Sequence, residues 1–407
     1  MHNRIRKILL ALMVNISLID VTNAEFELSG RVGFELRTWM DGSSLPGQND
    51  HGINPSLLLQ PELRYEWNES NDFIQFMPYL RLDAFDENRR FFDIRELFWR
   101  HRGDTWDFRF GVGQVFWGVA ESRHLVNIVN QVDTVEDIDE EDRLGQPMVN
   151  FTAYMDQWGT LDLFALPGFR ERRYSNRRGR LRLSAIPVEQ NTEVFESSLE
   201  EAHVDFAARW SHVIDEWDIA LSHFYGTSRE ARFVPRFNNF GQPVSLVPHY
   251  DIINQTALEL QWTRGSWLLK LEAITRSGHD RRLNALVGGF EYTFSGVFNT
   301  DMDVGVLAEY LWDDRSQFAP LTPLDDDLFA GLRFALNDVN NTEMLIGAIV
   351  DRHTGASIIS VEAQRRVFES WRISLDARLF LNVPRNDRAL FALKDDSFVN
   401  VSLAYYF

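Results

Sequence analysis

The stretch FVNVSLAYYF (398–407) alternates between apolar and mixed side chains with a period of two residues. In a strand, successive side chains point to opposite faces, so this period separates two faces of different character. One face is wholly apolar and carries Val399, Val401, Leu403, Tyr405 and Phe407. The other face is mixed and includes Asn400 and Ser402. Such a strand suits lipid or a protein core on one side and water on the other.

The same alternation recurs along the chain in short segments separated by Gly, Asn, Asp and Ser. Segments of about ten alternating residues are typical of the strands of a transmembrane barrel. Eighteen strands are predicted, near 26–40, 57–68, 72–84, 92–101, 105–113, 148–157, 161–167, 201–211, 217–226, 248–263, 266–276, 281–294, 302–312, 326–336, 342–350, 357–366, 371–380 and 397–407. Two segments deviate from the pattern. DIRELFWRHR (93–102) loses phase, which a bulge would explain, and MLIGAIV (344–350) is apolar on both faces.

The gaps between the predicted strands alternate in length. Long gaps lie at 41–56, 114–147, 168–200, 227–247, 313–325 and 381–395, and none of the even-numbered gaps between them is long. Outer-membrane barrels have short periplasmic turns, longer external loops and an even number of strands. The sequence therefore predicts an all-β fold, a closed transmembrane antiparallel β-barrel of about 18 strands with long external loops.

The N-terminus and the composition indicate export. Residues 1–7 are basic, residues 8–19 are mostly apolar, and Thr22-Asn23-Ala24 offers small residues for cleavage. Residues 1–24 are therefore predicted to be a signal peptide and residues 25–407 an outer-membrane barrel of a Gram-negative bacterium. The chain has no Cys, which excludes disulfides and thiolate metal sites. Its formal net charge of −19 disfavours nucleic acid as a partner.

Charged side chains occupy the faces opposite the apolar ones. They alternate in sign, and a water-filled lumen would tolerate them and let them pair across strands. Examples from five strands are Glu35, Arg37, Arg81, Arg109, Lys270, Glu272, Arg372 and Arg378. A barrel of this size leaves an aqueous channel unless a loop fills it.

Two successive long gaps carry opposite charge. The gap 114–147 contains an acidic run, DTVEDIDEED (133–142), and the next gap contains FRERRYSNRRGRLR (169–182). The first gap contains apolar residues such as Trp117 and Leu125, and their burial against another part of the protein would be favourable. We predict that 114–147 folds into the lumen and meets the arginines in a narrow charged passage that selects solutes. The alternative is that both gaps are solvated external loops.

Candidate residues for this constriction and for the pore lining come from both gaps and from the strands. They are Trp117, Glu121, Glu136, Asp137, Asp139, Glu140, Glu141, Asp142, Arg170, Arg172, Arg173, Arg177, Arg178, Arg109, Arg372 and Arg378. The centre of the first gap, SRHLVNIVNQV (122–132), is compatible with a short helix. Asp137, Asp139 and Glu141 are spaced like calcium ligands, but Asp142 stands where such a loop needs glycine. No metal site is predicted.

Two stretches resemble known outer-membrane proteins. The aromatic-Phe ending of FVNVSLAYYF resembles the C-terminal signature that the barrel assembly machinery of Gram-negative bacteria reads. VGQVFWGVAES (112–122) with NIVNQVD (127–133) is similar to a segment of porin-like proteins from a family of unknown function. That segment has a Gly-Arg-Gln strand end, Trp-Gly-Glu-Ser and an Asn-Pro-x-Asp turn, and the matching residues are Gly113, Gln114, Trp117, Gly118, Glu121 and Ser122. The resemblance implies a transport role and recognition of Phe407 by the assembly machinery.

The sequence contains no catalytic pattern that competes with transport. Glu121, Ser122 and His124 lie too close in sequence for a triad, and neither GxSxG nor HExxH occurs. We expect no enzyme activity and no cofactor, but passive or facilitated diffusion of small solutes. The alternatives are a plugged barrel that moves a hydrophobic or lipid-like substrate, and a surface barrel for interaction or adhesion. Outer-membrane lipid and lipopolysaccharide are expected partners, and an oligomer would use the same apolar faces as lipid.

Overall fold

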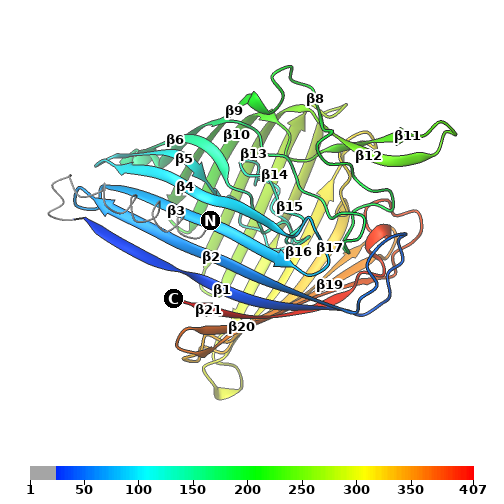
Figure 1. The fold of residues 1–407 in the computed structure, drawn as a ribbon. Helices are drawn as coiled ribbons and strands as arrows, with labels where there is room; N and C mark the ends of the chain where they lie inside the picture. The colour runs from blue at the N-terminus through cyan, green and yellow to red at the C-terminus, as the bar shows by residue number, and fades with distance from the viewer. Residues whose placement is uncertain (1–23) are drawn as a thin grey trace, which may run out of the picture.

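The computed structural model describes residues 24–407, and they form a closed barrel of eighteen antiparallel strands (Figure 1). The predicted signal peptide lies, apart from Ala24, outside the described residues. Barrel strands that follow one another along the chain pair with one another, and β1 pairs with β21 to close the ring. Closure leaves no barrel strand with a free edge. The predicted fold class and the strand number are both confirmed.

The strands of the barrel have the following bounds. They are β1 (Glu25–Trp39), β2 (Ile53–Trp67), β3 (Asp72–Asp83), β4 (Phe91–Arg102), β5 (Trp106–Gly113), β6 (Gln146–Tyr154), β7 (Thr160–Pro167), β9 (Val204–Ile214), β10 (Trp217–Thr227), β13 (Ile252–Arg264), β14 (Trp267–Ser277), β15 (Leu283–Phe294), β16 (Asp303–Asp313), β17 (Asp326–Ala335), β18 (Glu343–Asp351), β19 (Ser357–Phe368), β20 (Trp371–Leu381) and β21 (Phe398–Tyr406). Four short 3₁₀ helices lie between them: η1 (Asp156–Trp158), η2 (Glu200–Ala202), η3 (Val297–Asn299) and η4 (Phe391–Leu393). None of the helices among residues 24–407 is long and apolar enough to cross a membrane.

A second, three-stranded sheet stands outside the barrel and was not predicted. It consists of β8 (Val194–Phe195), β11 (Arg232–Phe237) and β12 (Pro243–Tyr250), and β11 and β12 form a projecting hairpin (Figure 1). The predicted strand 248–263 merged the end of β12 with β13. Period-two alternation looks the same in both kinds of strand, so the pattern does not reveal where the chain enters the barrel.

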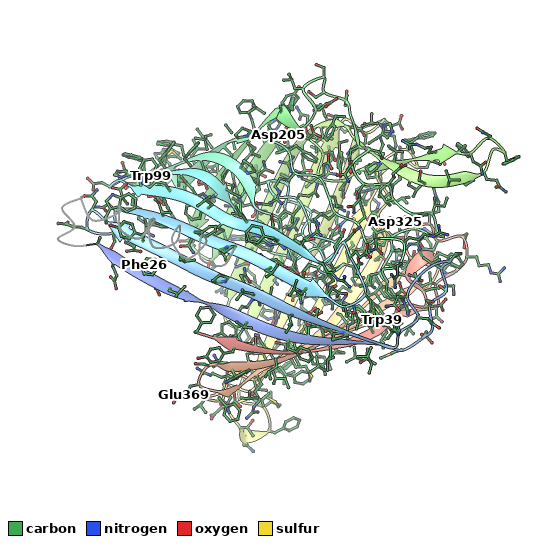
Figure 2. The ribbon with its side chains drawn as sticks, in the orientation of Figure 1. Phe26, Trp39, Trp99, Asp205, Asp325 and Glu369 are labelled. Atoms are coloured by element: carbon green, nitrogen blue, oxygen red, sulfur yellow. The ribbon has the colours of Figure 1, made fainter. Side chains whose placement is uncertain are left out.

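The barrel has a long-loop end and a short-turn end. We call the end with the loops 40–52, 114–145, 168–203 and 228–251 the long-loop end. Trp39 and Asp325 lie there, whereas Phe26 and Trp99 lie toward the opposite, short-turn end (Figure 2). Aromatic pairs follow the short turns, including Trp371 with Tyr405, whose ring centroids are 5.1 Å apart. An aromatic girdle of this kind marks the interface between hydrocarbon and water in transmembrane barrels.

The side chains divide between the two faces of the wall as the alternation predicts. Along β21, Val401, Leu403 and Tyr405 are exposed on the outer face, whereas Phe398 and Asn400 are buried on the inner face. The terminal stretch pairs with β20 and with β1, as its place in a closed ring requires. Its apolar face is therefore the outer surface of the barrel.

Both deviating segments have a structural explanation. Met77 and Pro78 of β3 pair with Glu96 and Ile94 of β4, so Arg95 is an extra, bulged residue of β4. In β18, Ile346 and Val350 are exposed on the outer face, whereas Leu345 and Ile349 line a cavity inside the barrel. The predicted bulge is present, and the doubly apolar strand has an apolar patch of the lumen on its inner face.

Candidate functional site

Residues 114–145, here called the crossing loop, lie within the barrel lumen. Six of its apolar side chains are almost fully buried against inward-facing apolar residues of the strands from β6 to β17. Those of the loop are Trp117, Ala120, Leu125, Val126, Ile128 and Val129. The ring of Trp117 meets Phe164 of β7 edge to face, with centroids 5.9 Å apart. Apolar packing therefore fixes the first half of the crossing loop to one side of the wall.

Two wall carboxylates bind the backbone of the same half. Glu272 of β14 accepts hydrogen bonds from the backbone N–H of Val119 (2.7 Å), Ala120 (2.9 Å) and Val126 (3.2 Å). Glu309 of β16 accepts from the N–H of Glu121 and of Ser122, both at 2.8 Å. Residues 122–132 form no helix, contrary to the expectation from sequence. Several N–H groups of 119–126 donate to these wall carboxylates instead of to carbonyls of their own segment.

The second half of the crossing loop binds the opposite wall through ion pairs. The acidic run lies at the tip of a short hairpin, in which Asp133 N–H donates to Asp142 O at 2.8 Å. Glu136 pairs with Arg81 of β3, and the bulged Arg95 donates to Asp133 at 2.7 Å. These four ionised side chains are buried, so each needs its partner to offset desolvation. The crossing loop is thus fastened to two opposite sides of the lumen.

Two cavities lie on either side of the acidic run. The larger one, of about 550 Å³, is lined by the crossing loop, by β17 to β20 and by residues of the long-loop end such as Phe233 and Leu390. The smaller one, of about 280 Å³, is lined by β1, β3, β20 and β21 and by Glu136, Asp137 and Asp142. Asp139 lines both cavities. The two spaces therefore approach each other at this residue.

The carboxylate of Asp139 faces a guanidinium at that place. Arg378 of β20 donates to Asp139 at 3.0 Å and to Glu362 of β19 at 2.7 Å. On the adjacent wall, Arg37 of β1 lies 3.5 Å from Asp137. A solute that moves between the two cavities would pass acids of the loop on one side and arginines of the wall on the other. This arrangement can discriminate solutes by charge as well as by size.

His124 adds a positive charge on the loop. Burial disfavours its charged form, but hydrogen bonds and Coulomb attraction from the carboxylates of Glu141 and Glu272 outweigh burial and raise the pKa of His124 to about 9. Its Nε2 lies 2.8 Å from Glu141. His124 is therefore charged at neutral pH and ties the acidic run to the part of the loop that Glu272 holds.

The structure brings nine of the predicted residues to the two cavities. The larger cavity receives Glu121, Asp139, Glu140, Glu141, Arg172 and Arg378, and the smaller one receives Glu136, Asp137, Asp139 and Asp142. Seven others lie elsewhere. Trp117 packs in the apolar core, Arg109 stacks on Phe98, and Arg372 lies near the short-turn end. Arg170 donates to Asp93, Arg173 stacks on Phe91, and Arg177 and Arg178 are exposed.

The arginine-rich stretch 169–182 contributes few partners to the acidic run. Two of its ion pairs reach the run, from Arg172 to Glu140 and from Arg173 to Asp133, each at 3.8 Å. Arginines of the wall and of the loop 84–90 make the shorter contacts with the run: Arg95 lies 2.7 Å from Asp133, and Arg89 lies 3.5 Å from Glu136. The loops approach each other, but the wall supplies most of the charge.

Sequence reasoning missed the wall carboxylates as anchors. Glu272 in WLLKLEAITRS and Glu309 in DVGVLAEYLWD are inward acids that are 0% and 4% exposed. A buried acid requires hydrogen-bond donors, and this requirement was the signal that the sequence offered. In the described part of the chain, no group of three or more His, Asp or Glu residues is arranged to hold a metal ion.

Comparisons with known proteins bear on the fold. The sequence matches no family model and no curated protein. OccK5 (OpdH) of Pseudomonas aeruginosa has a TM-score of 0.53 at 10% identity, covering 95% of this chain and 98% of that one. A BenF-like porin from Pseudomonas fluorescens Pf-5 has a TM-score of 0.54 at 10% identity, covering 95% and 98%. OccAB3 of Acinetobacter baumannii has a TM-score of 0.54 at 8% identity, covering 95% and 100%. At these identities the likeness establishes a shared porin-like barrel fold.

Proposed function

We propose that this protein is an outer-membrane channel through which small solutes diffuse passively, past a constriction that the crossing loop forms. The observation that carries the proposal is the pair of cavities that share Asp139 as a lining residue. A barrel wall of this size encloses an aqueous path, and an inward loop narrows it to the scale of a solute. The porin-like fold supports the same conclusion. The short-turn end would face the periplasm.

A cysteine at the constriction provides the test. The natural chain has no Cys, so the variant Asp139→Cys would carry the single thiol of the protein. In planar lipid bilayers, we expect steady conductance from the wild type. We expect a charged thiol reagent to reduce the conductance of Asp139→Cys from either side of the membrane, because residue 139 lines both cavities. A cysteine at Glu369, in the exposed turn between β19 and β20, is the matched control and should give no block (Figure 2).

The same recordings separate the channel from its alternatives. A plugged barrel for lipid-like cargo, or a barrel that serves for adhesion, would show no steady conductance in the wild type. Conductance that the reagent leaves unchanged in Asp139→Cys would place the solute path away from the acidic run and refute the proposed constriction.

Targeting is part of the proposal. We propose that residues 1–24 direct export and that the assembly machinery reads the strand ending in Phe407. The backbone N–H and carbonyl of Phe407 exchange 3.1 Å hydrogen bonds with Gly30 at the closing seam. Replacing Phe407 by Ser should lower the amount of barrel in the outer membrane without changing the conductance of the barrels that assemble. Unchanged assembly would contradict this role.

A further inference from the structure

Among the charged residues that line the larger cavity, acidic side chains are more exposed than arginine side chains. Its half-exposed carboxylates belong to Glu140, Glu141 and Glu362, whose side chains are 46%, 52% and 45% exposed. The arginines of the same cavity are far less accessible, with side-chain exposures of 10% for Arg172 and 7% for Arg378. A solute in this space therefore meets negative charge first, because the positive charges lie beneath it.

Of these three acids, Glu140 has the carboxylate with the fewest partners. Its nearest cation is the guanidinium of Arg172 at 3.8 Å, and no hydrogen bond to its carboxylate occurs within residues 24–407. Glu141 and Glu362 each keep one oxygen for a partner, His124 and Arg378. A carboxylate accepts several hydrogen bonds, so all three retain free acceptor sites that face the cavity.

Another part of the lining of the same cavity is apolar and aromatic. Phe329, Leu345, Ile349, Ile358 and Phe380 line it from β17 to β20. Apolar side chains that line a cavity favour a solute with an apolar body. The carboxylates and the apolar wall therefore share one space.

An aromatic pair completes the lining. Tyr174 and Phe233 pack edge to face with ring centroids 5.5 Å apart, and both line this cavity. Tyr174 is 3% exposed, and its hydroxyl has no hydrogen-bond partner in the part of the chain described. An unpaired phenol hydroxyl in a buried position is costly unless a ligand or water satisfies it. Aromatic rings beside carboxylates are the surroundings that favour organic cations.

We propose that the larger cavity is a binding site for amphipathic organic cations, with the ammonium group beside Glu140 and Glu141 and the apolar body against the β17–β20 wall. This inference rests on the proposed channel function, because it names the class of solute that the channel takes up first. The excess of accessible acids selects against carboxylate solutes of the same size.

Isothermal titration calorimetry on the full-length protein in detergent tests the site. The probes are benzyltrimethylammonium, its small relative tetramethylammonium, and benzoate as the aromatic anion. We expect benzyltrimethylammonium to bind more tightly than either of the others. The double variant Glu140→Gln/Glu141→Gln should weaken its binding about fivefold to tenfold or more, since it removes two charges that face the cation. Glu369→Gln makes an acid-to-amide change at the short-turn end and should leave binding unchanged.

The outcomes separate this site from the channel. Benzoate binding as tight as that of benzyltrimethylammonium, or an undiminished affinity in the double variant, would overturn the inference. Tetramethylammonium binding as tightly as benzyltrimethylammonium would overturn the role of the apolar wall. Binding is measured without conduction, so cation binding by a protein that shows no bilayer conductance would refute the channel alone. Steady conductance without any cation binding would refute the site alone.

Discussion

The contact between Glu272 and the crossing loop allows a quantitative prediction. In Glu272→Ala, three backbone N–H groups lose a charged acceptor. Hydrogen bonds to charged groups each contribute about 1.5–3 kcal/mol, so the three together contribute about 4–9 kcal/mol. The loss of these hydrogen bonds can release the loop only if the net free energy of docking the loop is small.

The favourable and unfavourable contributions to docking of residues 117–129 nearly cancel. Fixing the backbone of this segment costs about 13–26 kcal/mol, and burying its five large apolar side chains returns about 8–15 kcal/mol. The five backbone hydrogen bonds to Glu272 and Glu309 add about 8–15 kcal/mol, which leaves docking favourable by only a few kcal/mol. Removing Glu272 should therefore release the loop for a substantial part of the time.

Two measurements check this prediction. Amide hydrogen exchange of the peptide spanning 117–129 should accelerate in Glu272→Ala, and bilayer recordings should show larger and noisier conductance. Glu272→Gln should fall between this variant and the wild type, because its carbonyl oxygen can still accept from Val119 and Ala120. Glu66→Ala on β2 is the control, since Glu66 is also an acid on the inner face of the wall but pairs with Arg64 of its own strand instead of the loop. Exchange and conductance identical to the wild type in Glu272→Ala would refute the reasoning.

Three further predictions follow from single contacts. Arg378→Ala removes a positive charge beside Asp139, so conductance and cation preference should both rise in bilayers under a salt gradient; an unchanged reversal potential would contradict this. Because the pKa of His124 is raised to about 9, the stabilisation from its charged contact with Glu141 is fully present below about pH 6.5 and is lost as the pH rises through 9. Channel noise should therefore grow from pH 7 to 10 in the wild type but not in His124→Asn. Gly111→Ala places a side chain against the backbone of β4 at a φ of +136°, which costs about 1–3 kcal/mol and should lower the thermal midpoint.

The fold was predictable because a barrel wall imposes one rule on every strand. Each side chain faces either lipid or lumen, so the period of two recurs from strand to strand, and in β4 it resumes shifted by one residue after the bulge at Arg95. This rule does not apply to strands outside the barrel wall. That is why β8, β11 and the start of β12 escaped prediction, and why β12 was joined to β13 across Asp251.

The candidate site was predictable only in its composition. The apolar residues near Trp117 and the acids of 133–142 indicated an inward loop with a charged tip. The partners of those acids could not be read from neighbouring segments, because Arg81 and Arg378 reach them across the lumen from distant strands. The abundance of arginine in 169–182 suggested that this loop, the next long one along the chain, would pair with the acids. The positions of the strands around the barrel instead decide which side chains meet.

The anchoring of the crossing loop also fixes an order of assembly. Val119 and Glu272 are 153 residues apart, and Ser122 and Glu309 are 187 apart. The loop precedes the strands that hold it, so its native contacts form only after β14 and β16 have joined the sheet. Contacts of such long sequence separation form late, because loop-closure entropy opposes them until the rest of the chain is in place. A newly closed barrel would thus pass through an open stage, and the passage would narrow as the last step of folding.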